Sequence, residues 1–183
     1  MHLRELMQRG PYQAYAYAYP HKTAYRDLAQ PVPLQQVWAE ENRDALFAYV
    51  HVPFCSYRCG FCNLFALGNP AADLVDRYVD QLVRQLGIVG PLLGQHRFAR
   101  FALGGGTPSY LTAAQLDRIF TAVTRELTID PQAIPAGIEV SPETATRDRL
   151  QVSRDMGCDR VSMGVQSFVD AELQALVRPT QRR

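Results

Sequence analysis

The chain has 183 residues, of which 47% are apolar and 20% are charged, and its formal net charge at pH 7 is +1. This composition is that of an ordinary soluble globular protein and predicts a single domain. The small charge predicts no affinity for nucleic acid or acidic membranes, and no apolar run approaches the ~20 residues that span a bilayer. Because the sequence shows no secretory signal, we expect a cytoplasmic protein whose four cysteines stay reduced.

Residues 1–45 are predicted to form an N-terminal extension ahead of a core domain of residues 46–183. Four tyrosines crowd the stretch before Pro20, and a short helix is expected around residues 34–43. Neither feature predicts a function by itself.

Strands and helices are predicted to alternate through the core domain. Apolar runs of strand length occupy residues 47–52, 98–103, 136–140 and 160–165. Helices are expected over residues 73–86, before Gly87, from a capping box at Thr112 and Gln115 to Leu127, over 146–156, before Gly157, and over 170–177. This order predicts an α/β fold with parallel strands and right-handed crossovers.

Three cysteines follow the first predicted strand in one loop, at Cys55, Cys59 and Cys62. A structural zinc site needs four protein ligands, whereas catalytic metal sites leave one position open. Iron–sulfur clusters are held by cysteine thiolates, normally four. Three thiolates would therefore leave one iron free to bind a small molecule, and an open iron implies chemistry.

Other interpretations of the three cysteines remain open at this point. A disulfide would leave one thiol unpaired, and zinc could recruit Cys158, His51 or His96 as its fourth ligand. Cys158 stands alone ahead of a strand and is more typical of a small core residue. The spacing favours the cluster.

Polar and small residues follow the later strands as well, where ligands bind in parallel α/β folds. Glycines at 104–106 let backbone groups approach a ligand closely, with a tight turn as the alternative. Glu139 lies between apolar neighbours, so we expect it to have a cationic or hydrogen-bonding partner, with a buried pair with an arginine as the structural alternative. Gln166 follows the fourth strand, and Arg178 can bind a carboxylate through two hydrogen bonds.

Four motifs thus occur in order at strand ends, in residues 49–62, 104–108, 138–140 and 162–168. In this order they resemble the radical S-adenosylmethionine (SAM) enzymes, in particular the oxygen-independent coproporphyrinogen III oxidase-like group, which also contains haem chaperones. The resemblance covers residues 46–179. That family builds six βα units and a further C-terminal domain. With four units here, we expect a partial, truncated barrel with an unpaired edge.

The resemblance also implies cofactors and ligands. Cys55, Cys59 and Cys62 would hold a [4Fe-4S] cluster whose fourth iron binds SAM, and a donor such as flavodoxin or ferredoxin would supply the electron that cleaves SAM. The resulting radical would abstract hydrogen from a small-molecule substrate, with a tetrapyrrole as the suggested class. The residues implied to contact SAM are Tyr49, Phe61, Gly105, Gly106, Thr107, Glu139, Gln166 and Arg178. Some members bind two SAM molecules, and the second would touch Phe61, Gly106, Thr107, Gln166 and Arg178.

One position departs from the resemblance. Decarboxylating members carry a further cysteine two positions after the third cluster cysteine, where this chain has Leu64. The leading hypothesis is therefore a radical SAM oxidoreductase of the coproporphyrinogen III oxidase-like group. A haem-binding chaperone of the same family and an inactive truncated remnant are the two alternatives.

Overall fold

A computed structural model describes residues 26–62 and 64–178. Within these ranges a four-stranded sheet has the order β1-β4-β5-β6, and every pairing in it is parallel. Its strands are β1 (Leu46–Val52), β4 (Phe98–Gly105), β5 (Ala136–Val140) and β6 (Arg160–Met163). The predicted α/β fold with four βα units is confirmed.

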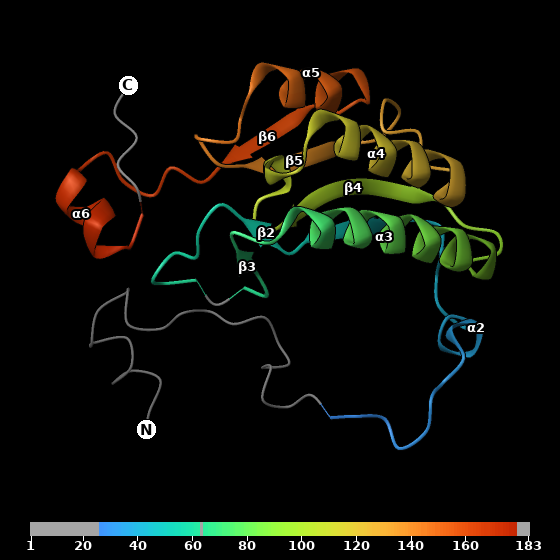
Figure 1. The fold of residues 1–183 in the computed structure, drawn as a ribbon. Helices are drawn as coiled ribbons and strands as arrows, with labels where there is room; N and C mark the ends of the chain where they lie inside the picture. Colours follow the sequence, from blue (N-terminus) through green and yellow to red (C-terminus); the bar gives the residue numbers. More distant parts are fainter. Residues whose placement is uncertain (1–25, 63, 179–183) are drawn as a thin grey trace, which may run out of the picture.

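Helices α3, α4 and α5 cover one face of this sheet (Figure 1). The helices that follow the four strands are α3 (Ala72–Leu92), α4 (Ala113–Leu127), α5 (Arg147–Asp155) and α6 (Asp170–Ala175). The capping box at the start of α4 is present: the Thr112 hydroxyl accepts from the Gln115 backbone N–H, and the Gln115 side chain accepts from the Thr112 N–H. Together they satisfy two backbone donors that a helix start leaves free.

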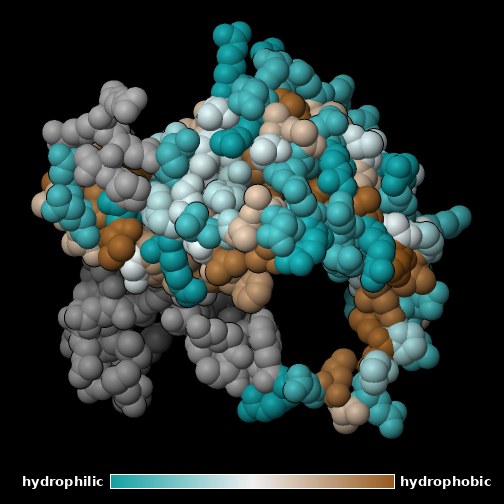
Figure 2. All heavy atoms as spheres, viewed as in Figure 1, coloured by the Kyte–Doolittle hydropathy of each residue, from teal (hydrophilic) through white to brown (hydrophobic). Residues whose placement is uncertain are grey.

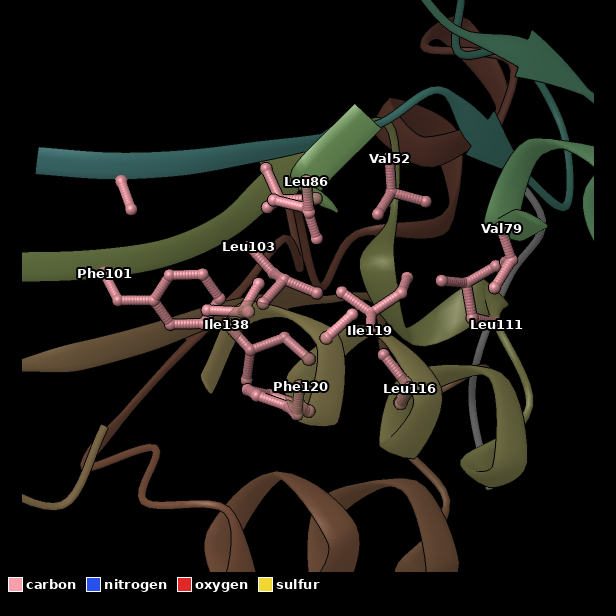
Figure 3. Packing of buried hydrophobic residues seen from close by; sticks show 14 of the residues in the cluster. Val52, Val79, Leu86, Phe101, Leu103, Leu111, Leu116, Ile119, Phe120 and Ile138 are labelled. Carbon is pink, nitrogen blue, oxygen red and sulfur yellow. The ribbon is translucent and has the colours of Figure 1, made fainter. Parts of the chain in front are cut away.

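The hydrophobic core lies between the sheet and the helices (Figure 3). Phe101 and Leu103 of β4 point toward α4, and the Phe101 ring meets the Phe120 ring edge-on with centroids 5.9 Å apart. Alternate residues of β1 and β5 join them, because side chains of a strand point to opposite faces in turn. The buried members drawn in Figure 3 include Val52, Val79, Leu86, Leu116, Ile119 and Ile138.

The predicted end of α3 at Gly87 is wrong, because the helix continues to Leu92. Gly90 serves helix packing. A Cβ atom at Gly90 would lie 2.0 Å from the Glu126 carbonyl oxygen, whereas one at Gly87 would make only an ordinary contact with the Glu126 carboxyl group, at 3.7 Å. Two helices can approach this closely only where one of them has no side chain.

One further expectation about local structure fails, and one small sheet was not expected. Helix α2 spans only Leu34–Val37, since none of its residues is buried and a single unsupported turn is unstable. The cysteine loop contains a small parallel sheet that the sequence did not suggest, in which β2 (Phe54–Cys55) pairs with β3 (Leu67–Gly68). The tyrosine-rich stretch at residues 12–19 lies outside the described residues.

Strand β6 forms one edge of the sheet, as predicted for a partial barrel. Its residues are all exposed, including Val161 at 49% and Met163 at 47%. The outer surface of the helix layer is largely hydrophilic over α4 and α5 (Figure 2). No helix among the described residues is long and apolar enough to cross a membrane.

Candidate cofactor site

A cleft at the carboxyl ends of the strands collects most of the predicted site residues. The loop after β1 forms one wall, and the segments after β4, β5 and β6 form the others. Eight of the predicted residues line it, namely Cys55, Cys59, Phe61, Cys62, Gly106, Thr107, Gln166 and Arg178. The other three, Tyr49, Gly105 and Glu139, lie beside it, toward the face of the sheet that carries no helices.

The cysteine loop is held in shape by backbone contacts. The Leu67 N–H donates to the Pro53 carbonyl at 2.8 Å, and the Asn69 N–H donates to the Cys55 carbonyl at 2.8 Å. The Gly60 N–H donates to the Leu176 carbonyl at 2.9 Å, which ties the loop to the end of α6. The loop is therefore bound both to the chain that leaves it and to the last described helix.

Two donors reach the sulfur atoms. The Thr107 hydroxyl donates to Cys55 Sγ at 3.4 Å, and an Arg178 N–H donates to Cys59 Sγ at 3.3 Å. Burial raises the pKa of the Cys55 thiol; the Thr107 hydrogen bond lowers it, and the nearby Cys62 and Cys59 raise it further. All three cysteines are free thiols, half-buried in the same cleft. Within the described residues, no three His, Cys, Asp or Glu side chains already converge in metal-ligand geometry.

Each glycine of the triplet makes room for a different neighbour. A Cβ atom at Gly106 would lie 2.9 Å from Cys55 Sγ, and one at Gly104 would lie 2.8 Å from the Tyr49 ring. Gly105 has φ +113°, and a Cβ there would lie 2.9 Å from the His51 ring. The triplet is thus more than a tight turn, because side chains of both neighbouring strands close over it.

Glu139 is exposed, so the expectation that it is buried is wrong, and so is the alternative of a buried pair with an arginine. Its Oε2 atom accepts from the Gly105 N–H at 3.1 Å. The Tyr49 side chain lies close by, and its pKa is raised by burial and then by the charge of Glu139. One carboxylate and one phenol therefore flank the second glycine.

Gln166 and Arg178 close the far side of the cleft. Gln166 has φ +73°, a conformation that few side chains adopt and that recurs at functional sites. Arg178 donates to the Gly164 carbonyl at 2.8 Å and lies over the Tyr57 ring, 5.6 Å from its centroid. Its guanidinium group thus links the cysteine loop to the segment after β6.

None of the three residues considered as a fourth zinc ligand, Cys158, His96 and His51, is available at the cysteine loop. Cys158 and His96 directly precede β6 and β4. They therefore lie at the amino ends of the strands, whereas the cysteine loop lies at the carboxyl ends. Cys158 packs against the core, and burial raises the pKa of its thiol to about 12. His51 lies near the loop, but both ring nitrogens are engaged: Nε2 donates to the Phe65 carbonyl at 2.7 Å, so Nδ1 accepts from the Tyr49 hydroxyl at 3.2 Å.

Sequence reasoning missed Tyr57 and Glu143, which also line the cleft. The Tyr57 hydroxyl donates to Glu143 Oε2 at 3.5 Å, across 86 positions of the chain. Burial and the nearby Glu143 raise the pKa of Tyr57 to about 12. A contact between residues so far apart leaves no periodic signal, and no spacing rule could have found it.

The profile of the Radical SAM superfamily matches residues 49–183. The chain belongs to the radical SAM superfamily. It is 34% identical over 176 residues to the oxygen-independent coproporphyrinogen III oxidase of Salmonella typhimurium, covering 92% of this chain and 38% of that protein. It is also 29% identical over 134 residues to the heme chaperone HemW of Bacillus subtilis, covering 72% of this chain and 34% of that protein.

A solved structure supports the same placement of this radical SAM chain. Coproporphyrinogen III oxidase (HemN) from Escherichia coli, described as a radical SAM enzyme, superposes with a TM-score of 0.79 at 27% identity. The match covers 97% of this chain and 39% of that one. The chain therefore spans about two fifths of the length of such relatives.

The cleft suits the iron–sulfur cluster that radical SAM proteins generally use. Cysteine thiolates are the usual ligands of such clusters. The missing side chain at Gly106 lets Cys55 Sγ approach the backbone after β4, and the donors from Thr107 and Arg178 favour negative charge on sulfur. The residues present thus fit the group.

Proposed function

We propose that this chain forms the cofactor-binding part of a radical SAM oxidoreductase of the coproporphyrinogen III oxidase-like group. Residues 46–183 would be its core domain and residues 1–45 an extension. The observation that carries the proposal is one cleft holding three free thiols, Gly106 packed against Cys55 Sγ, and the carboxylate of Glu139 alongside.

Cys55, Cys59 and Cys62 would hold a [4Fe-4S] cluster through their thiolates. When bound, this cluster supplies an open iron for SAM and, after reduction by a donor such as flavodoxin or ferredoxin, the electron that cleaves it. Thr107 and Arg178, which donate to two of the sulfurs, would stabilise the thiolates. Their hydrogen bonds also fix the directions in which the Cys55 and Cys59 sulfurs point.

Residues that line the cleft and residues beside it would together orient SAM. Glu139 keeps one carboxylate oxygen free of the Gly105 N–H and would attract the ammonium group or accept from ribose hydroxyls. Tyr49 and Phe61 are each 51% exposed and offer ring faces and edges to a nucleoside. Gln166 would add amide hydrogen bonds from the opposite wall.

The test is anaerobic reconstitution with iron and sulfide, followed by dithionite and SAM. The expected product is 5′-deoxyadenosine, detected by chromatography. Serine in place of Cys55, Cys59 or Cys62 is expected to remove most of the iron and the brown absorbance. Cys158→Ser is the matched control and is expected to keep both, since Cys158 lies at the other edge of the sheet. Full iron content in all three serine variants would contradict the proposal.

A second candidate is a haem-binding chaperone with the same cleft. Leu64 favours it: this half-exposed apolar side chain lines the cleft at the position where decarboxylating relatives carry a further cysteine. Titration with haem distinguishes the two functions. A Soret band that saturates at one haem per chain, with little SAM cleavage, would favour the chaperone, whereas 5′-deoxyadenosine without a Soret shift would favour the oxidoreductase.

A further inference from the structure

Glu143 lines the cofactor cleft together with the three cysteines, and the proposed function gives it no role. Among the described residues that line the cleft it is the one acidic side chain, and the two cations are Arg58 and Arg178. Arg178 directs donors to Cys59 Sγ and to the Gly164 carbonyl oxygen. The Glu143 carboxylate is therefore a charge in the cleft without an assigned use.

The turn that carries Glu143 is anchored at both ends by buried hydroxyl groups. Ser141 and Thr144 are 6% and 5% exposed, and their side-chain oxygens form a hydrogen bond of 2.8 Å. The Thr144 N–H donates to the Ser141 carbonyl at 3.1 Å, which closes the turn. Ser109, which follows β4, adds a third buried hydroxyl that hydrogen-bonds to Thr144. Buried hydroxyls that satisfy one another rigidify a segment, so a fixed support presents Glu143 to the cleft.

Tyr57 holds the same carboxylate from the opposite wall. This residue lies in the cysteine loop, two positions from Cys55 and two from Cys59, and its hydroxyl donates to Glu143 Oε2 at 3.5 Å. Burial is the main cause that raises the pKa of the Cys55 thiol, and the charge of Glu143 is a further one. The carboxylate thus lies close enough to the cysteine loop to act on it electrostatically.

We propose that Glu143 lowers the reduction potential of the iron–sulfur cluster that the three cysteines would hold. Reduction transfers one electron from the donor to the oxidised cluster, and no bond forms or breaks in this step. A carboxylate nearby repels the added negative charge, so the reduced form is destabilised relative to the oxidised form. This inference rests on the proposed function and adds to it a residue that sets how strongly reducing the bound cluster is.

The size of the effect depends on where the carboxylate points, and Tyr57 sets this direction. Glu143 is exposed, so without the Tyr57 hydroxyl it can turn toward solvent, where its charge is screened. Tyr57 is therefore a positioning residue, whose removal should give part of the effect of removing the charge. A more strongly reducing cluster favours electron transfer to SAM, which is the use of a lower potential in the proposed function.

The experiment is a redox titration of the reconstituted full chain without SAM, with dithionite as reductant in the presence of mediators. Visible absorbance and the electron paramagnetic resonance of the reduced cluster follow the titration. The variants are Glu143→Gln, Glu143→Asp and Tyr57→Phe. Asp117→Asn is the matched control, because it removes one negative charge from the exposed surface of α4. Iron content and circular dichroism verify that each variant is loaded and folded.

Glu143→Gln is expected to raise the midpoint potential. At a fixed potential the ratio of reduced to oxidised cluster should rise about fivefold, or ~40 mV for one electron, the effect of one solvent-screened charge at short range. Tyr57→Phe should raise it less, and Glu143→Asp should stay closer to the parent because it keeps the charge. High salt should shrink the difference between Glu143→Gln and the parent, since salt screens an exposed carboxylate. Asp117→Asn should match the parent.

Three outcomes would overturn the inference alone: equal potentials of the parent and Glu143→Gln, an equal shift in Asp117→Asn, or a shift that is the same at low and high salt. The last would mean that Glu143→Gln acts through the shape of the cleft and not through its charge. A parent chain that holds no reducible cluster would overturn the proposed function together with the inference. Iron content and midpoint potential therefore separate the two failures.

Discussion

The two faces of the sheet use the same strands for opposite purposes. On the helix side, Phe101 and Leu103 are at most 2% exposed and pack against α4. On the other side, the residues between and after them are Ala102 and Gly104, small residues that line a cavity on the face without helices. One alternation of side chains along β4 thus builds a dense core on one face and a ligand-sized space on the other.

This contrast separates stability from binding within single strands. Burying apolar area stabilises the fold, so losses on the helix face should appear as unfolding. The helix-free face of the sheet and the cofactor cleft carry small, aromatic and charged residues, among them the half-exposed Tyr49 and Phe61. Changes there should leave the fold intact and alter what it binds.

The largest effect is expected from Phe120→Ala. The Phe120 side chain is fully buried and meets the Phe101 ring edge-on. Truncation to Ala removes that contact and leaves a cavity, and should lower the free energy of unfolding by about 3–5 kcal/mol. Thermal and urea denaturation would measure this loss of stability.

Tyr49→Ala is the control for the opposite face. Tyr49 is 51% exposed, so its truncation should cost well under half of the Phe120 value. Equal losses from the two variants would contradict the division between the faces.

An intermediate effect is expected from Gly90→Ala in α3. The new Cβ atom would lie 2.0 Å from the Glu126 carbonyl oxygen, which is backbone and cannot swing aside. Overpacking of this kind typically costs about 1–3 kcal/mol, more than the ~1 kcal/mol that alanine gains over glycine in a helix. Denaturation should therefore show a net loss of stability.

Gly87→Ala, one turn earlier in the same helix, provides the comparison. Its Cβ atom would meet only the Glu126 carboxyl group, at 3.7 Å. Helix propensity then dominates, and stability should rise by up to about 1 kcal/mol. The same sign for both variants would show that close helix packing does not explain Gly90.

These two glycines also show where sequence reasoning fails. The apolar period of α3 predicted its buried face, including Val75 and Val79, because period 3.6 records which residues face the core. It could not distinguish a glycine that ends a helix from one that lets a second helix approach. That choice depends on Glu126, almost forty positions away.

The residues of the candidate site also divide into those that the sequence could predict and those that it could not. Cys55, Cys59 and Cys62 were predictable because three ligands within one loop must lie near each other. The order of strand ends also brought Gly106, Gln166 and Arg178 to the same edge, since parallel strands present their carboxyl ends together. The exposure of Glu139 was not predictable, because its apolar neighbours in sequence point to the other face.

The smallest effect on stability is expected from Gly104→Ala, which tests the helix-free face of the sheet directly. The new Cβ atom would lie 2.8 Å from the Tyr49 ring and 3.1 Å from Glu139 Oε2. Unlike the backbone oxygen at Gly90, both are ends of exposed side chains that can turn away. The free energy of unfolding should therefore change by less than about 0.5 kcal/mol.

The same substitution should have a large effect on SAM binding. Displacing Tyr49 and Glu139 would disturb two groups proposed to orient SAM, and the Kd of the reconstituted protein for SAM should rise about tenfold, or ~1.4 kcal/mol. Gly137→Ala is the control, because its Cβ atom would meet only Arg160, and Gly137 lies two residues before Glu139 on β5, farther from the cysteine loop. A loss of stability without a change in SAM affinity would place Gly104 with the core residues and remove the distinction between the two faces.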